Sequence, residues 1–275
     1  MEFGGKGGGL KAFNETWGFS KGNWRELFPA QNPDIFGVMA YDNSTQQVIK
    51  FGGDLVSYYR GHPSFTPTNE TWGFSGGNWS ELHPRHSPPA GLGFALVTYD
   101  PGVHGLLLYG SVPSRNGTWI WQVWEYASSN WSPVLIGSQL PRVFGMAYDP
   151  AYHGVVGVGQ VSVTNSSFAT WLWRNGSWTR LVTSNLPSAA SFNGLQCVVY
   201  DSARKALLFA STGARVVSSK TWLLSNGHWR AALSAQVPRT RHYFGMTYDG
   251  TDTYVLLYGG NANYGLPFDQ TWIFR

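Results

Sequence analysis

The chain has 275 residues and a net charge of +4; 16% of its residues are aromatic, 12% are charged and 34 are glycine. This composition suits many short strands and tight turns with little helix. Because Lys and Arg form no cluster, nucleic-acid binding is disfavoured, and no apolar run approaches the roughly 18 residues of a membrane span. Met1 leads directly into a predicted strand, so no signal peptide is expected there.

A tryptophan is followed seven residues later by a second tryptophan in five places along the chain. The leading tryptophans recur every 47 to 55 positions, which predicts a repeat architecture. The pairs are Trp17/Trp24, Trp72/Trp79, Trp124/Trp131, Trp171/Trp178 and Trp222/Trp229, and Trp272 is a sixth leading residue.

Turn-forming residues separate the two tryptophans of each pair. Asn-Gly and Gly-Gly supply the positive φ angles that a two-residue hairpin requires. Such a turn places Trp24 opposite Phe19, with Trp17 on the same face. We expect the resulting apolar triads to pack between neighbouring units. The turn dipeptides are Lys21-Gly22, Gly76-Gly77, Ser128-Ser129, Asn175-Gly176 and Asn226-Gly227.

A Tyr-Asp pair is the second landmark of the repeat. An apolar stretch precedes each pair, and a β-rich stretch ending in small residues follows it, so each unit reads as four strands. We name them A (before Tyr-Asp), B (ending in small residues), C (first Trp) and D (second Trp). The pairs are Tyr41-Asp42, Tyr99-Asp100, Tyr148-Asp149, Tyr200-Asp201 and Tyr248-Asp249.

The units differ in completeness. Residues 1–27 supply strands B, C and D, and residues 243–275 supply A, B and C. Complete units are expected at about 35–84, 93–135, 143–183 and 194–234. Four-stranded units of this length are typical of propeller blades.

The small-residue doublet that closes strand B, as in Gly52-Gly53 and Gly259-Gly260, resembles the kelch family of β-propellers. The aromatic residue in strand C, the tryptophan that opens strand D and Arg85, Arg142 and Arg241 ahead of three A strands extend the resemblance over the whole chain. It implies an all-β, kelch-type β-propeller of about six four-stranded blades, with incomplete first and last blades. Residues 1–275 would form one propeller domain or a segment of a larger repeat protein. The Thr-Trp strands look most like divergent repeats of archaeal surface proteins.

Asn-X-Ser/Thr acceptors for N-glycosylation point to an extracellular or cell-surface protein. The alternative is that Asn, Ser and Thr are simply common in β-turns. The single Cys197 excludes an internal disulfide. The acceptors are Asn14, Asn43, Asn69, Asn78, Asn116, Asn130, Asn165 and Asn175.

Residues that recur in register are best explained by architecture. The Tyr-Asp aspartates are expected to accept local backbone N–H bonds, and His104 and His153 both lie four residues after such an aspartate. Tyr152-His153 and Cys197 give a superficial echo of the copper site of galactose oxidase. However, both positions are repeated turn or core slots, and no metal-ligand spacing occurs. We therefore expect no cofactor, no metal and no enzymatic activity.

Residues that break register are better candidates for binding, and they lie mostly in the B–C and D–A connections. The longest B–C connection, Asp54–Asn69, is expected to be a loop. Trp119 is either an off-register aromatic or an alternative start of strand C. Aromatic and basic groups together suit stacking on sugars or binding an acidic partner; the alternative is that these loops only cover the blades. The candidates are Tyr58, Tyr59, Arg60, His62, Arg115, Trp119, Trp121, Arg142, Arg241, His242 and Tyr264.

The function most consistent with the sequence is a noncatalytic binding or adhesion module. Its partner would be a surface glycan or surface protein held by the face that carries the B–C and D–A connections. A second hypothesis is a structural spacer within a larger surface assembly. A third is an enzyme related to galactose oxidase or to a sugar epimerase.

Overall fold

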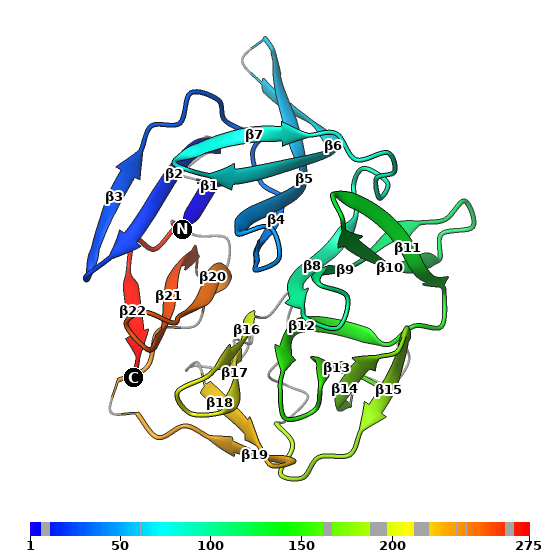
Figure 1. Cartoon of the computed structure of the whole chain (residues 1–275), viewed down its shortest axis with the longest axis vertical. Coiled ribbons are helices and arrows are strands. Elements are labelled where there is room, and N and C mark those ends of the chain that lie inside the picture. Colours follow the sequence, from blue (N-terminus) through cyan, green and yellow to red (C-terminus); the bar gives the residue numbers. More distant parts are fainter. Residues whose placement is uncertain are drawn as a thin grey trace. The chain divides into compact units, whose positions relative to one another are not determined.

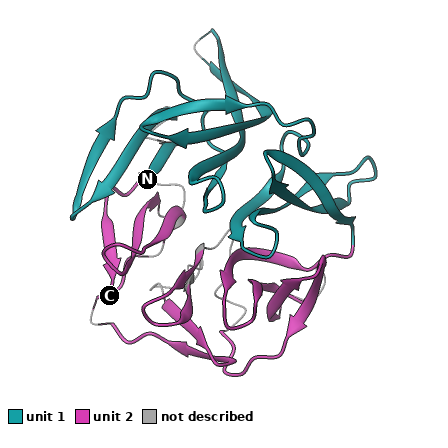
Figure 2. Ribbon diagram, viewed as in Figure 1, with its two compact units in different colours: residues 1–138 teal, residues 139–275 magenta. Residues whose placement is uncertain are grey.

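The computed structural model of the chain describes residues 1–6, 12–60, 62–161, 167–187, 197–211, 220–234, 236–239, 241–261 and 267–275. Every regular element in these ranges is a β-strand, and the strands form six antiparallel sheets (Figure 1). The chain divides into two compact units, Met1–Ser138 and Gln139–Arg275 (Figure 2). No helix that could span a membrane is present among these residues. We number the sheets as blades 1 to 6 in chain order.

Unit 1 contains blades 1 to 3. Blade 1 has three strands, and blades 2 and 3 have four strands each. The strands are β1 (Glu2–Lys6), β2 (Ala12–Ser20) and β3 (Asn23–Leu27); β4 (Val38–Asp42), β5 (Gln47–Tyr59), β6 (His62–Ser75) and β7 (Asn78–Leu82); and β8 (Gly93–Asp100), β9 (Gly105–Pro113), β10 (Trp119–Ala127) and β11 (Asn130–Gly137).

Unit 2 contains blades 4 to 6. Blades 4 and 5 have four strands each and blade 6 has three, so the predicted pattern of complete and incomplete blades is confirmed. The strands are β12 (Arg142–Asp149), β13 (Gly154–Gln160), β14 (Phe168–Arg174) and β15 (Ser177–Leu181); β16 (Cys197–Asp201), β17 (Ala206–Ser211), β18 (Lys220–Ser225) and β19 (His228–Ala231); and β20 (His242–Asp249), β21 (Tyr254–Asn261) and β22 (Thr271–Phe274).

The tryptophan hairpins have the predicted register. Phe19 pairs with Trp24, and the equivalent positions pair in blades 2 to 5. Asn175 and Gly176 have φ angles of 53° and 74°, as a two-residue turn with two positive φ angles requires. The Tyr-Asp aspartates cap their turns as expected: Asp149, for example, accepts the backbone N–H of Ala151 at 2.9 Å.

The second tryptophan of one blade is joined to the preceding blade by a recurrent hydrogen bond. In unit 1, the indole N–H of Trp131 donates to the Thr71 hydroxyl at 2.9 Å, and Trp131 is fully buried. In unit 2, Trp229 donates in the same way to Thr170 at 3.0 Å. Each acceptor threonine directly precedes a leading tryptophan. The prediction that the tryptophan triads pack between blades is confirmed at these positions.

The connection Asp54–Asn69 is not the loop that the sequence suggested. Strands β5 and β6 continue as a paired ladder out to Tyr59 and His62. We call this extension, residues 54–68, the arm (Figure 1). The loop prediction is wrong because the segment alternates β-formers on both sides of a tight turn at Arg60, which has a φ of 50°.

Candidate binding site

A cavity of about 180 Å³ lies between blades 2 and 3 at the base of the arm. We call it the unit 1 cavity. Its walls come from the starts of strands A in both blades, from the end of strand B and from the return strand of the arm. The lining residues are Gly37, Val38, Phe51, Gly52, Gly53, Asp54, Pro67, Thr68, Gly91, Leu92 and Ala95.

The repeat explains why this cavity exists. The position four residues before the Tyr-Asp tyrosine is phenylalanine in blades 4 and 6, where Phe144 and Phe244 are buried. The same position is Gly37 in blade 2 and Ala95 in blade 3, and both residues line the cavity. Two neighbouring blades therefore lack a large side chain at a core position, and an empty space results.

Blades 2 and 3 lack that phenylalanine but carry an aromatic residue one position earlier, where blade 6 has Tyr243. Phe36 and Phe94 stand five residues before the tyrosine, and their φ angles are 60° and 53°. Tyr243 of blade 6 has a φ of 56° at the same repeat position, so this left-handed backbone is a feature of the repeat. A shift of one residue also turns the side chain away from the core face. Both rings therefore lie beside the cavity instead of filling it.

Two exposed aromatic residues extend this rim. Phe65 of the arm lies 6.2 Å from Phe36 between ring centroids, and Trp119 at the start of β10 lies 6.0 Å from Phe94. Phe65 is 37% exposed and Trp119 is 46% exposed. Phe65 is close in sequence to Pro67, which lines the cavity. Trp119 is linked to the cavity through Phe94, which directly precedes the lining residue Ala95. We call Phe36, Phe65, Phe94 and Trp119 the aromatic rim.

The polar groups available at the cavity are those of Asp54 and the backbone of the glycine pair Gly52-Gly53, whereas the hydroxyl oxygen of Thr68 is buried. The glycines are required, because a Cβ on Gly53 would lie 2.4 Å from the carbonyl oxygen of Ile35. A Cβ on Gly37 would lie 2.6 Å from the carbonyl oxygen of Gly52. Close backbone approach therefore shapes this wall.

Lys50 supports the same wall from behind. Its ammonium group is buried and donates to the carbonyl oxygen of Gly52, with the ring of Phe3 at 5.6 Å. Burial lowers the pKa of Lys50 from 10.5 to about 8, against the attraction of Asp34, Glu70 and Asp54. Burial and the neighbouring charge of Glu70 raise the pKa of the Asp34 carboxyl. A buried cation with three carboxylates nearby is a recognised mark of a functional region.

In blade 6, a different buried cation bonds to the equivalent glycine carbonyl. Arg241 is fully buried and donates to the carbonyl oxygen of Gly259 at 2.8 Å and to Gln270 at 3.0 Å. Gly259 and Gly52 occupy the same repeat position, and Asp34 stands where Arg241 stands in blade 6. In blade 2 the cation that bonds to this carbonyl is therefore Lys50 of strand B, whereas in blade 6 it is Arg241, which precedes strand A.

Two predicted ligand contacts belong to the blade interior. Trp121 is 3% exposed and its ring is stacked on Tyr109 with centroids 5.3 Å apart. Arg241 is used by the backbone of its own blade, as described above. Since neither side chain presents an accessible face, we leave both out of the candidate site.

The other predicted contacts are spread out. Tyr58 and Tyr59 are 66% and 71% exposed and lie with Arg60 and His62 at the tip of the arm. Arg115 is exposed in the β9–β10 turn, which also leads into Trp119. In unit 2, Arg142 is half-buried with its guanidinium over Phe144 at 5.4 Å. The side chain of His242, and Tyr264, fall outside the described residues.

Sequence reasoning missed Phe36, Phe94 and Lys50. Lys50 breaks the register of the repeat, which is the signal that could have found it, whereas Phe36 and Phe94 share their repeat position with Tyr243. Lys50 stands where Leu108, Phe209 and Leu257 stand in three other blades, each of them paired with the leading tryptophan of its blade. Lys50 lies within a strand, whereas the contacts predicted from the sequence lie mostly in the connections between strands.

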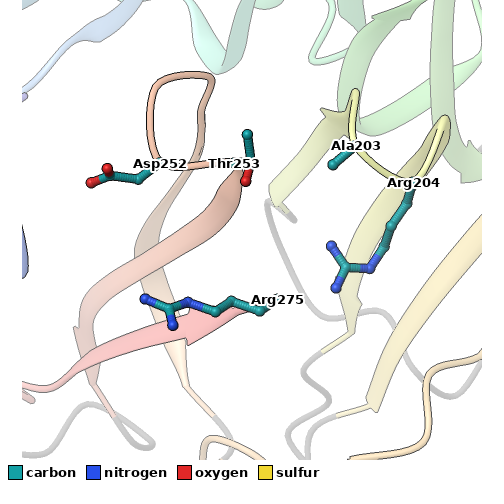
Figure 3. A pocket seen from close by; sticks show the side chains of 5 residues that line it. All are labelled: Ala203, Arg204, Asp252, Thr253 and Arg275. Carbon is teal, nitrogen blue, oxygen red and sulfur yellow. The ribbon is translucent and has the colours of Figure 1, made fainter.

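Unit 2 has an open hollow of about 650 Å³ (Figure 3). Figure 3 shows that its lining residues come from two A–B turns, with Arg204 in one and Asp252 in the other, and from Arg275 after β22. Arg204 already forms an ion pair of 2.7 Å with the buried Asp201 and lies 4.6 Å from the Phe274 ring. Because Arg204 is already paired with a carboxylate and the hollow is open to solvent, we take the unit 1 cavity as the candidate binding site.

Within the described ranges, no three His, Cys, Asp or Glu side chains come together in a way that could hold a metal ion. Asn14, Asn43, Asn69, Asn78, Asn116 and Asn175 are exposed and Asn130 is half-buried, whereas Asn165 falls outside the description. Asn78 and Asn130 also accept backbone N–H bonds from Ala30 and His86, each at 3.0 Å. A glycan on the amide nitrogen would leave these oxygens in place.

Known proteins resemble this chain in structure only. No family model matches its sequence, and no curated protein matches it. The solved structure of YjhT is similar with a TM-score of 0.62 at 12% identity, covering 91% of this chain and 84% of that one. That of RS223-β-xylosidase is similar with a TM-score of 0.53 at 8% identity, covering 87% and 91%. Together with the six sheets, this likeness establishes a β-propeller fold.

Proposed function

We propose that the chain is a kelch-type propeller that acts as a noncatalytic, cell-surface glycan-binding module, with the unit 1 cavity as its sugar-binding site. The observation that carries the proposal is the combination of a small cavity with an aromatic rim. Aromatic faces stack on the C–H groups of a sugar ring, and carboxylate and backbone groups bind its hydroxyls. Asp54 and the Gly52-Gly53 backbone supply those polar groups here.

The size of the cavity specifies the ligand further. A volume of about 180 Å³ is below the roughly 300–1,000 Å³ of pockets for drug-sized ligands. It therefore suits one sugar ring, such as the terminal residue of a glycan, with the exposed Trp119 and Phe65 contacting the adjoining part. Asp54 and the neighbouring Asp34 favour a neutral or basic sugar over an acidic one.

A cavity-filling substitution tests this proposal. We expect Ala95→Phe, which restores the residue type of blades 4 and 6, to abolish binding on a glycan array while leaving the melting temperature unchanged or higher. Trp119→Ala should weaken binding about 2- to 30-fold, corresponding to about 0.5–2 kcal/mol for a lost aromatic contact.

The control is Tyr41→Ala, which removes another exposed aromatic residue of unit 1 from a Tyr-Asp turn. It should leave binding unchanged. Undiminished glycan binding by Ala95→Phe would rule out the cavity as the site. An empty screen with glycans and with surface proteins would favour a structural spacer.

A sugar-processing enzyme is the second candidate. It is favoured by the pKa of Asp34, which burial and the neighbouring charge of Glu70 raise, since a raised pKa is the direction that suits a general acid. Turnover of chromogenic glycosides that is lost in Asp34→Asn but kept in Asp252→Asn would support it.

The cell-surface assignment makes a separate prediction. Protein from its native source should carry N-glycans, most of all at Asn43 and Asn175, which are exposed in turns, and also at Asn78 and Asn130. Peptide mapping with and without a glycosidase will locate them. An intact mass equal to that of the unmodified polypeptide would contradict the assignment.

A further inference from the structure

The arm has two free edges, and only one of them is able to pair with another strand. The backbone N–H of Asp54 donates to Ile35 at 2.9 Å, so the backbone groups of Asp54 point away from β6. Direction alternates along a strand, so those of Val56 and Tyr58 also point away from β6. Among the described residues, no strand pairs with this edge beyond the bridge at Asp54.

The opposite edge of the arm is blocked by prolines. Pro67 pairs with Asp54, Phe65 with Val56 and Pro63 with Tyr58, so these three residues of β6 also point outward. Proline has no backbone N–H, and proline on an edge strand prevents further pairing. The β6 edge is therefore protected at two of its outward positions, whereas the β5 edge is open at Val56 and Tyr58, beyond the bridge at Asp54.

We propose that the arm is a self-association element, in which β5 pairs antiparallel with β5 of a second copy across a two-fold axis at Ser57. In this register Val56 lies opposite Tyr58 of the second copy, and both have outward backbone groups, so each pair exchanges N–H···O bonds. Antiparallel pairing of identical strands is the isologous contact that closed dimers use. This inference does not depend on the proposed glycan site.

The side chains of the arm fit this register on both faces. Val56 meets Tyr58 on one face, and Leu55 meets Tyr59 on the other, which are favourable cross-strand pairs. Leu55, Tyr58 and Tyr59 are 53%, 66% and 71% exposed in the single chain. Pairing would therefore cover the most exposed apolar side chains of the arm.

Charge complementarity identifies a second copy as the partner. The tip of the arm carries Arg60 and His62, whereas its base carries Asp54 and the nearby Asp34. Antiparallel pairing places Arg60 opposite Asp54 of the second copy. A parallel or tip-to-tip arrangement would bring the two Arg60 side chains together, so the charges select the antiparallel dimer.

The experiment compares prolines on the two edges by sedimentation equilibrium. We expect the wild-type chain to dimerise reversibly and Val56→Pro to raise the dissociation constant at least tenfold. The Val56 N–H is not part of the β5–β6 ladder, so the arm should remain folded. Phe65→Pro, directly across the arm on the blocked edge, is the matched control and should dimerise like the wild type. Glycan binding should be kept by Val56→Pro, because Val56 belongs neither to the cavity lining nor to the aromatic rim.

Cross-linking and charge reversal provide independent readouts. In a Cys197→Ser background, Ser57→Cys should form an intermolecular disulfide, whereas Ser64→Cys, its cross-strand neighbour, should not. Arg60→Asp should weaken the dimer, and Asp54→Arg combined with Arg60→Asp should restore it. A wild-type chain that stays monomeric at all concentrations, or a dimer that survives Val56→Pro, would overturn the proposal, as would equal cross-linking through both cysteines.

Discussion

Replacing Trp131 by Ala should lower the free energy of unfolding by about 3–5 kcal/mol, the usual cost of truncating a large buried aromatic residue. Trp131 is completely buried, and its ring lies 5.3 Å from Phe51 of the preceding blade and 4.9 Å from Tyr126 of its own. The substitution opens a cavity between blades 2 and 3 and leaves the Thr71 hydroxyl without its indole donor. Urea denaturation will measure the loss.

Two comparisons separate packing from hydrogen bonding. Thr71→Val keeps the shape of the side chain but removes the acceptor of the Trp131 N–H, and it should cost about 1–3 kcal/mol. Trp119→Ala removes an indole that is 46% exposed and should cost well under half as much as Trp131→Ala. A loss below about 1 kcal/mol for Trp131→Ala would mean that the blades are not held together by these residues.

The strands of the propeller could be predicted because the same turn and strand signals recur in successive repeats. The turn dipeptides fixed the hairpin register, so that Phe19 and Trp24 face each other as expected. The Tyr-Asp pairs located every A–B turn for the same reason. Local φ requirements and side-chain alternation are properties of short segments, which sequence reasoning reads well.

The candidate site was less accessible to sequence reasoning because it depends on absent side chains. The cavity exists where Gly37 and Ala95 replace the phenylalanines of other blades. Small apolar residues carry no reactive group, so the sequence gives no direct sign of a binding site at these positions. The arm is difficult to predict from the sequence because two of its outward positions are prolines, which usually interrupt strands. Trp121 was misread because its burial depends on Tyr109 of the adjacent strand.

Lys50→Met should raise the free energy of unfolding at pH 7 by roughly 2–3 kcal/mol, because the folded chain buries a charge that the unfolded chain leaves in water. Burial lowers the pKa of Lys50 from 10.5 to about 8. Below pH 8 both states are protonated, so the folded state carries the full cost. Between pH 8 and 10.5 the unfolded state binds more protons, so the stability of the wild type rises with pH.

The gain from Lys50→Met should therefore shrink as the pH rises from 8 and approach zero near 10.5. Thermal unfolding at a series of pH values measures it, and Lys220→Met, which removes an exposed lysine, should give no gain at any pH. A loss of stability at pH 7 would contradict the prediction. It would mean that the attraction of Lys50 to Asp34 and Glu70, together with its bond to Gly52, exceeds the cost of burial.

The same variant connects stability to the proposed function. Strand B carries leucine or phenylalanine at this position in three other blades, so an apolar residue is compatible with the fold. A lysine that lowers stability there is best explained by its contact with the Gly52 carbonyl, which forms part of the cavity wall. Proteins often keep such costly groups where function needs them. We therefore expect Lys50→Met to bind glycan more weakly than the wild type while unfolding at a higher temperature, and unchanged glycan affinity in calorimetry would show that Lys50 has no part in the site.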